Sequence, residues 1–110
     1  MDYEQDRGEI LFQVRTPLEF DVRTIVSYWT YISTVKHPQM RGREADVHLT
    51  LAQPDEVRLS KNDPRVYMFY RDDGEKRWIC GVTKKLNGDG FLITAYRTGA
   101  IKEGVLIWPM

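Results

Sequence analysis

Four side chains of the types that cleave RNA without a metal ion lie apart in the sequence: His37, Arg58, Lys84 and Tyr96. Such cleavage needs a base for the ribose 2′-hydroxyl, an acid for the leaving 5′-oxygen and a cation for the phosphorane charge. Histidine, lysine, arginine and tyrosine can fill these roles at neutral pH. This chemistry requires that folding bring the four side chains together, so the elements that carry them decide whether it is available.

Other chemistries have little support in the sequence. The chain has no P-loop, no Rossmann glycine pattern, no HExxH and no CxxC. Its histidines, His37 and His48, lack the close spacing of a metal-binding pair, and Cys80 is the single cysteine. We therefore expect neither a metal nor a cofactor, and we expect Cys80 to be an inert buried thiol.

Each candidate residue also has a purely structural interpretation. His37 can act on the helix dipole at a helix C-terminus, and Tyr96 can pack as a sheet aromatic. Arg58 and Arg71 can pair with nearby carboxylates, and Lys84 can be a solvated strand lysine. From composition and spacing alone, the chain is a soluble α+β domain.

Hydrophobic periodicity predicts the elements that carry these residues. Apolar residues at steps of three and four predict a helix from Asp21 to His37 and a second from Arg43 to Gln53. Pro38 should end the first helix at His37. Strands are predicted at 9–15, 56–60, 66–71, 77–86, 91–98 and 101–108. The expected architecture is α+β, one domain over 1–110: a first strand at 9–15, then two N-terminal helices packed on a four- to five-stranded antiparallel sheet formed by the later strands.

The two strands around the turn at 87–90 carry two of the four candidates. Alternation places Lys84 on one face with Trp78, Cys80 and Val82, and places Leu92, Thr94 and Tyr96 together on a face of the next strand. The turn sets how the two strands are paired, and a shift of one residue would exchange the faces. The sequence leaves open whether Lys84 and Tyr96 share a face.

The charge is balanced overall but unevenly distributed. The 110 residues contain 16 Lys+Arg and 16 Asp+Glu. Residues 56–110 carry the excess of positive charge, so an anionic ligand should meet this half. The acidic start of the chain is unlike a signal peptide, and no apolar run approaches the roughly 20 residues of a membrane helix. We expect a cytoplasmic protein with no membrane contact.

A series of short motifs runs in order from about Gly8 to Lys102. It comprises Trp29-x-x-Ile32, Lys36-His37-Pro38-Gln39-Met40, Val47-x-x-x-Leu51, Pro54-Asp55-Glu56-Val57-Arg58, Ser60-x-x-Asp63-Pro64, Tyr67-x-x-Tyr70-Arg71, Val82-x-Lys84 and Gly90-Phe91-Leu92-Ile93-Thr94-Ala95-Tyr96. In this order the motifs resemble the phage-type Barnase–EndoU–Colicin–RelE-like (BECR) proteins. The resemblance implies a RelE/barnase-like fold and a metal-independent ribonuclease, in some members a toxin or phage effector.

The same resemblance implies roles for individual residues. It implies His37, Lys84, Tyr96 and Arg58 as catalytic residues, and Thr94 and Arg71 as substrate-binding residues. The chain departs from the pattern at Gln39, where an acidic residue often follows the His-Pro pair, and this removes a candidate carboxylate.

Two functions therefore remain open. In an endoribonuclease, Arg58 and Lys84 would neutralise the scissile phosphate, His37 would be the base or acid, and Tyr96 the other proton carrier or a stacking platform. In a non-catalytic module, the same fold would bind RNA or a protein, and a lost active site is a third reading. RNA is the expected partner, while a protein partner or antitoxin and a homodimer stay open. The apolar stretch 105–108 fits either an interface or a last strand.

Overall fold

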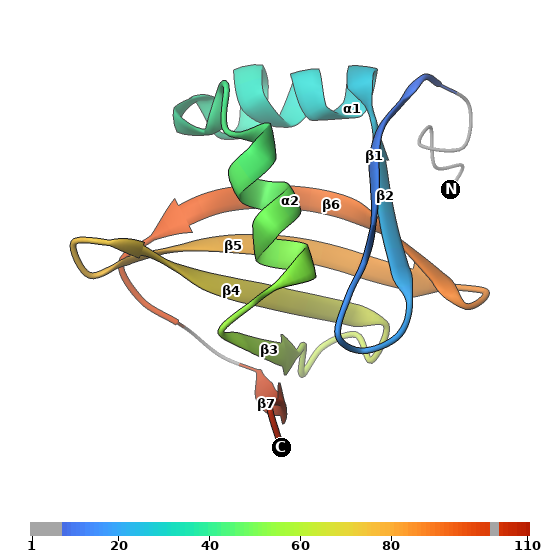
Figure 1. Cartoon of the computed structure of the whole chain (residues 1–110), viewed down its shortest axis with the longest axis vertical. Coiled ribbons are helices and arrows are strands. Elements are labelled where there is room, and N and C mark those ends of the chain that lie inside the picture. The colour runs from blue at the N-terminus through green and yellow to red at the C-terminus, as the bar shows by residue number, and fades with distance from the viewer. Residues whose placement is uncertain (1–7, 102–103) are drawn as a thin grey trace.

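A single seven-stranded sheet organises the chain (Figure 1). The computed structural model describes residues 8–101 and 104–110. The strands are β1 (Ile10–Arg15), β2 (Asp21–Ile25), β3 (Glu56–Leu59), β4 (Val66–Gly74), β5 (Arg77–Leu86), β6 (Asp89–Thr98) and β7 (Val105–Trp108). Their spatial order is β1-β2-β6-β5-β4-β3-β7. All neighbours are antiparallel except β2 and β6, which pair in parallel.

The helical segments lie between β2 and β3 in the chain. They are α1 (Val26–Tyr31), the π-helical η2 (Ile32–Lys36), the 3₁₀ turn η3 (Pro38–Met40) and α2 (Glu44–Ala52). Figure 1 shows α2 crossing one face of the sheet and α1 running beside β6. The hydroxyl of Tyr28 in α1 donates a hydrogen bond of 2.7 Å to the carbonyl of Ile93 in β6. This bond ties α1 to the strand that carries Thr94 and Tyr96.

The expected RelE/barnase-like architecture, two helices on a four- to five-stranded antiparallel sheet, is wrong. The sheet has seven strands and is mixed, because the β1–β2 hairpin joins the main sheet through a parallel pairing with β6. At the other edge, β7 pairs with β3 and extends the sheet further. The strands predicted around 56–60, 66–71, 77–86 and 91–98 do form the central antiparallel meander.

The first helix begins at Val26 and not at Asp21, because the preceding residues form β2. Val22, Thr24 and Ile25 are β-branched, and such side chains pack well in strands and restrict χ1 in helices. Val22 pairs with Val14 of β1, and both side chains are buried. Their cross-strand packing outweighs the helical spacing of the apolar residues. The helical region ends at Lys36, as the proline after His37 predicts.

The core lies between α2 and the sheet. Val47 and Leu51, one turn apart on α2, are fully buried. A Cβ placed on Gly81 of β5 would lie 3.2 Å from a Leu51 methyl group, so α2 approaches the sheet backbone closely there. Glycine at this position permits that approach, since a larger side chain would force Leu51 to move.

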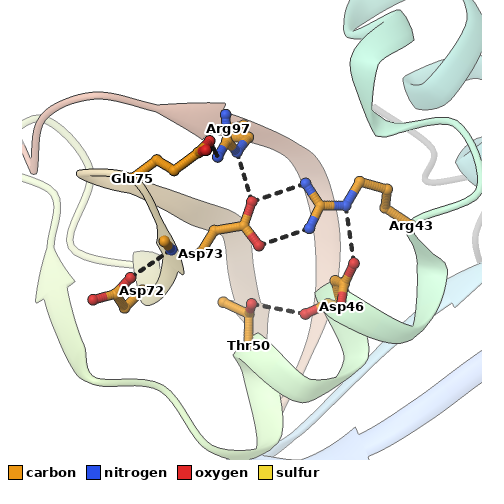
Figure 2. Close-up of polar contacts among 8 residues, drawn as sticks. Arg43, Asp46, Thr50, Asp72, Asp73, Glu75 and Arg97 are labelled. Atoms are coloured by element: carbon orange, nitrogen blue, oxygen red, sulfur yellow. Dashed lines mark hydrogen bonds and ion pairs between the residues drawn. The ribbon is translucent and has the colours of Figure 1, made fainter.

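An ionic cluster attaches the start of α2 to the sheet (Figure 2). The Asp73 carboxylate accepts two hydrogen bonds from Arg43, of 2.9 and 2.7 Å, and one of 2.6 Å from Arg97 of β6. Arg43 also donates to Asp46 in the first turn of α2. We call Arg43, Asp73 and Arg97 the Asp73 cluster. It connects α2, the β4–β5 hairpin and β6, so it fixes the position of the helix on its face.

Candidate functional site

Cross-strand pairing decides which side chains share the sheet face opposite α2. Paired residues project to the same side of a sheet, and successive residues alternate. Because Gly81 faces Leu51 on α2, its neighbours in β5, Cys80 and Val82, project to the other side. We call this side the back face. By pairing it carries Glu56, Arg58, Val66, Met68, Tyr70, Trp78, Cys80, Val82, Lys84, Phe91, Thr94 and Tyr96.

The back face includes Arg58, Lys84, Thr94 and Tyr96, four of the six residues singled out from the sequence. The pairing of β5 with β6 settles the register that the sequence left open. Cys80 lies opposite Tyr96, so Lys84 and Tyr96 belong to one face. These candidates come from β3 and from the two consecutive strands of the β5–β6 hairpin.

A β-bulge corrects the expected grouping of Leu92 with Thr94 and Tyr96. Val82 pairs with Thr94, but the next residue, Thr83, pairs with Leu92, which leaves Ile93 as the extra residue. Leu92 therefore faces α2 and is fully buried, while Thr94 and Tyr96 face the other way. The period of two cannot hold through a bulge, so the predicted grouping is wrong at this one residue.

Arg71 lies on the α2 face, apart from the other candidates. It follows Tyr70, which projects to the back face, so Arg71 projects to the opposite side. Its guanidinium donates a hydrogen bond to the carbonyl of Gln53, at the C-terminal end of α2. Cations favour this end of a helix because its carbonyl groups lack partners and carry partial negative charge. Arg71 has a structural partner here and is separate from the predicted substrate site.

His37 reaches the back face from the turn that follows η2. The π-helical turn closes with a hydrogen bond of 2.8 Å from the His37 amide to the Ile32 carbonyl. This places the imidazole against Tyr96, with 5.4 Å between the ring centroids and planes inclined at 44°. His37 and Tyr96 are thus neighbours in space although they come from distant parts of the chain.

The surroundings shift the pKa values of both rings. Burial, with a smaller contribution from the charge of Lys36, lowers the pKa of His37 below its usual 6.5. His37 is therefore neutral at pH 7 and can accept a proton. Burial is also the main cause that raises the pKa of Tyr96, and Cys80 adds to it. Tyr96 keeps its proton, so it can donate a hydrogen bond or stack, and it is a weak acid.

The two cationic candidates each have an acidic partner. The Lys84 ammonium lies 3.4 Å from a carboxylate oxygen of Asp63, in the loop between β3 and β4. Arg58 donates to the Glu56 carboxylate, and also to the Gly104 carbonyl at 3.3 Å. Arg58 therefore pairs with a neighbouring carboxylate, as its purely structural interpretation predicts. An anionic ligand would have to compete with Glu56 and Asp63.

Strand geometry separates the candidates along the back face. Lys84 pairs with Phe91, five positions from Tyr96 on β6, which corresponds to about 15 Å between Lys84 and Tyr96. Arg58 starts the row Arg58–Met68–Val82–Thr94, so three strand spacings, about 14 Å, separate its backbone from that of Thr94. These backbone positions suit contacts with several points of an extended ligand better than with one phosphate.

Other side chains of the back face were not among the predicted site residues. Tyr70 and Cys80 are buried, and Trp78 is half-buried. Burial raises the pKa of the Cys80 thiol to about 11, although hydrogen bonds with Tyr96 and Tyr70 act in the opposite direction. Cys80 is therefore the inert thiol that the sequence predicts. The alternation of residues 78–84 already placed Trp78 on the same face as Lys84, and this was the signal in the sequence that Trp78 belongs to the back face.

Thr94 has an unusual environment for a substrate-binding residue. Its hydroxyl oxygen is buried and has no hydrogen-bond partner in the structure. A buried hydroxyl without a partner costs free energy, so Thr94 is a polar group that a contact could still satisfy. The hydroxyl is covered, and a ligand would reach it only if neighbouring side chains move.

Within residues 8–101 and 104–110, no set of three or more His, Cys, Asp or Glu side chains is arranged to hold a metal ion. Over the same residues, no helix combines the length and apolar character needed to cross a membrane. Comparisons with family models, curated proteins and solved structures gave no match to this chain.

Proposed function

We propose that the protein binds single-stranded RNA along the back face without cleaving it. The observation that supports this most is the spread of the candidates over one face: about 15 Å separates the backbone of Lys84 from that of Tyr96, and about 14 Å separates the backbone of Arg58 from that of Thr94. Groups at such spacing can contact successive phosphates and bases of an extended strand. A single scissile phosphate would require them to converge.

The composition of the back face agrees with this ligand. Proteins that bind single strands combine cations for the backbone with aromatic side chains on which bases stack. Lys84 and Arg58 supply the charge, and the half-buried Tyr96 and Trp78 supply ring surfaces. Because Asp63 and Glu56 already occupy the cations, the affinity should be modest and should fall steeply with salt.

Cleavage by the same face is the second candidate, and it is favoured by one contact. A neutral His37 lies against the protonated Tyr96 at the border of the back face. Such a histidine could take the proton of a ribose 2′-hydroxyl, with Tyr96 placing the adjacent base by stacking. The toxin-like activity implied by the BECR resemblance would require this step. A cytoplasmic location would give either activity access to RNA.

Binding can be measured by fluorescence anisotropy of a labelled 12-nucleotide RNA over a range of salt concentrations. Lys84→Gln should weaken binding several-fold and reduce the slope of log K against log salt by about 0.7, the loss of one phosphate contact. The matched control is Lys85→Gln, because Lys85 is the next residue but lies over the Phe20 ring on the α2 face. Lys85→Gln should leave the affinity unchanged.

The same samples distinguish binding from cleavage on a denaturing gel. Intact RNA after prolonged incubation supports the binding module. RNA fragments that vanish with His37→Ala, in a protein that keeps its melting temperature, would replace it with the endoribonuclease. Absence of binding at low salt, or equal losses from Lys84→Gln and Lys85→Gln, would refute both proposals for this face.

A further inference from the structure

The end of the back face next to the β4–β5 hairpin presents three side chains in one row. Strand pairing places Asp72 of β4 and Thr98 of β6 on either side of Trp78 in β5. Successive residues of a strand alternate between faces, so Asp72 projects away from the Asp73 cluster. Figure 2 shows the Asp72 side chain on the side of β4 opposite to Asp73. Asp72 and Trp78 thus lie together on the face that carries the other RNA-binding candidates.

The Asp72 carboxylate differs from the acidic groups beside the other candidates. Glu56 pairs with Arg58, and Asp63 lies 3.4 Å from Lys84. Asp72 is exposed, and among residues 8–101 and 104–110 no cationic side chain pairs with it. An exposed carboxylate repels phosphate groups. On a face that binds RNA, it is favourable only where it meets hydrogen-bond donors of the ligand.

The direction of the Asp72 carboxylate is fixed by its own turn. Its Oδ1 accepts a hydrogen bond of 2.6 Å from the Gly74 amide, and the Asp72 amide donates one of 2.6 Å to Oδ2 of Asp55. Each carboxylate oxygen can accept more than one hydrogen bond, so both oxygens can still accept from a ligand. The Thr98 hydroxyl is used in its own turn, with Ala100. Asp72 is therefore the group of this row that can read a ligand.

Trp78 supplies a ring surface beside this carboxylate. Residues paired across antiparallel strands have Cβ atoms about 5 Å apart, so the indole borders the Asp72 side chain. Trp78 is half-buried, and no aromatic ring within the described ranges stacks on it. Tyr96 belongs to the next row, two residues or about 7 Å along the strands. Trp78 and Tyr96 can therefore stack neighbouring bases of one extended strand.

A carboxylate at the edge of a stacking ring distinguishes bases by their donors. Guanine has N1–H and the N2 amino group side by side on its Watson–Crick edge, which matches the two oxygens of a carboxylate. Adenine and cytosine each offer one amino group beside a ring nitrogen that accepts. The N3–H of uracil lies between two carbonyl oxygens, which a carboxylate repels. Guanine is the base that this pair of acceptors fits.

We propose that Asp72 and Trp78 form a guanine-binding site on the back face. The inference rests on the RNA binding proposed above and specifies which base the protein selects. Guanine stacks on Trp78, and the Asp72 oxygens accept from its N1–H and its N2 amino group. The next base stacks on Tyr96, and the strand continues toward Lys84. Asp72 thus discriminates between sequences, whereas Lys84 contacts the backbone of any strand.

Fluorescence anisotropy of three labelled RNAs tests this base preference. Each RNA has 12 nucleotides of alternating adenine and cytosine, with guanine, inosine or adenine at one central position. The RNA with guanine should bind at least about ten-fold more tightly than the RNA with adenine, because a two-donor contact discriminates by at least this much. Inosine keeps N1–H and lacks the amino group, so its affinity should fall between them. This comparison uses the wild-type protein and does not depend on how any variant folds.

Asp72→Asn tests the carboxylate itself. The asparagine oxygen can still accept from the Gly74 amide, so the melting temperature should be unchanged. Its amide nitrogen would face the guanine donors, so this variant should bind the guanine RNA about ten-fold more weakly, no better than the adenine RNA. The matched control is Glu75→Gln, which removes the same charge from the same hairpin. It should leave the preference for guanine intact.

The outcomes separate the guanine site from the RNA binding on which it rests. Equal affinities of the wild type for the three RNAs, or the same preference in Asp72→Asn as in Glu75→Gln, would overturn the guanine site. Binding that still depends on Lys84 would in that case leave the RNA-binding function standing. A wild type that binds none of the three RNAs at low salt would overturn both.

Discussion

Removal of the Asp73 carboxylate should destabilise the protein more than most substitutions of partly exposed residues do. Asp73→Ala eliminates three charge-assisted hydrogen bonds, two from Arg43 and one from Arg97. It also leaves two guanidinium groups facing each other without the carboxylate between them. The change should therefore loosen α2 from the β4–β5 hairpin as well as remove bonds.

The magnitude follows from the exposure of the Asp73 cluster. The side chains of Asp73, Arg43 and Arg97 are 18%, 27% and 29% exposed. Exposed ion pairs contribute up to about 1 kcal/mol, and breaking a buried pair costs about 3–5 kcal/mol. An intermediate cost of about 2–3 kcal/mol is expected, which corresponds to a fall in the melting temperature of about 10 °C.

The contribution of Asp73 should also depend on pH. Hydrogen bonds from Arg43, the largest cause, hold the pKa of Asp73 below its usual 3.8. A group whose pKa is lowered by folding stabilises the fold above the unfolded pKa, and this stabilisation disappears as the pH falls through the folded pKa. The destabilisation by Asp73→Ala should be full at pH 7 and should shrink as the pH falls below 3.8.

Urea unfolding at pH 7, in a double-mutant cycle of Asp73→Ala and Arg43→Ala, measures this coupling. The matched control is Glu75→Gln, because Glu75 also approaches Arg97, at 3.7 Å, but is 89% exposed. Its midpoint should equal that of the wild type. A coupling energy below about 0.5 kcal/mol between Asp73 and Arg43 would refute this prediction, since the Asp73 cluster would then contribute no more than an ordinary exposed ion pair.

Two further predictions concern a glycine and the cysteine. Gly104 has φ +100°, and an added Cβ would lie 2.8 Å from the Leu59 carbonyl oxygen. In urea unfolding, Gly104→Ala should lower the free energy of unfolding by about 3 kcal/mol. Gly42→Ala should lower it by about 1 kcal/mol, because Gly42 also has a positive φ, +78°, but an added Cβ would meet nothing within 4 Å. Equal losses for the two variants would contradict the steric clash at Gly104. Because burial raises the pKa of Cys80 to about 11, native protein at pH 8 should react with iodoacetamide at least about 100-fold more slowly than unfolded protein. Equal rates would show that the thiol is accessible.

The parts of the fold that the sequence predicts are those with local signals. Pro54 and the paired apolar positions Val47 and Leu51 define α2, and the glycine turn at 87–90 defines the β5–β6 hairpin. β2 was misassigned because its β-branched residues continue a helical apolar spacing into α1. The strand is selected by its pairing with the neighbouring β1 and with β6, which lies far away in the chain.

The candidate site, too, is predictable only where the signal in the sequence is local. Alternation correctly places Thr94 with Tyr96, and it fails at Leu92 because a bulge leaves no clear mark in the sequence. The contact of His37 with Tyr96 depends on a π-helical turn, which apolar spacing cannot indicate. The Asp73 cluster could not be predicted from the sequence either. Asp73 lies in a stretch that is typical of a polar turn, and its partner Arg43 is thirty positions away in the chain.

The parallel contact between β2 and β6 sets a condition on how this protein is made. Val22 and Arg23 pair with β1 on one side, but on the other side their partners are Gly90 and Phe91, far along the chain. During synthesis, the first hairpin must wait until most of the chain has left the ribosome before it has a neighbour to join. Contacts this distant along the chain slow folding. Until they form, the apolar side chains of β2 are a surface that other nascent chains or chaperones can bind.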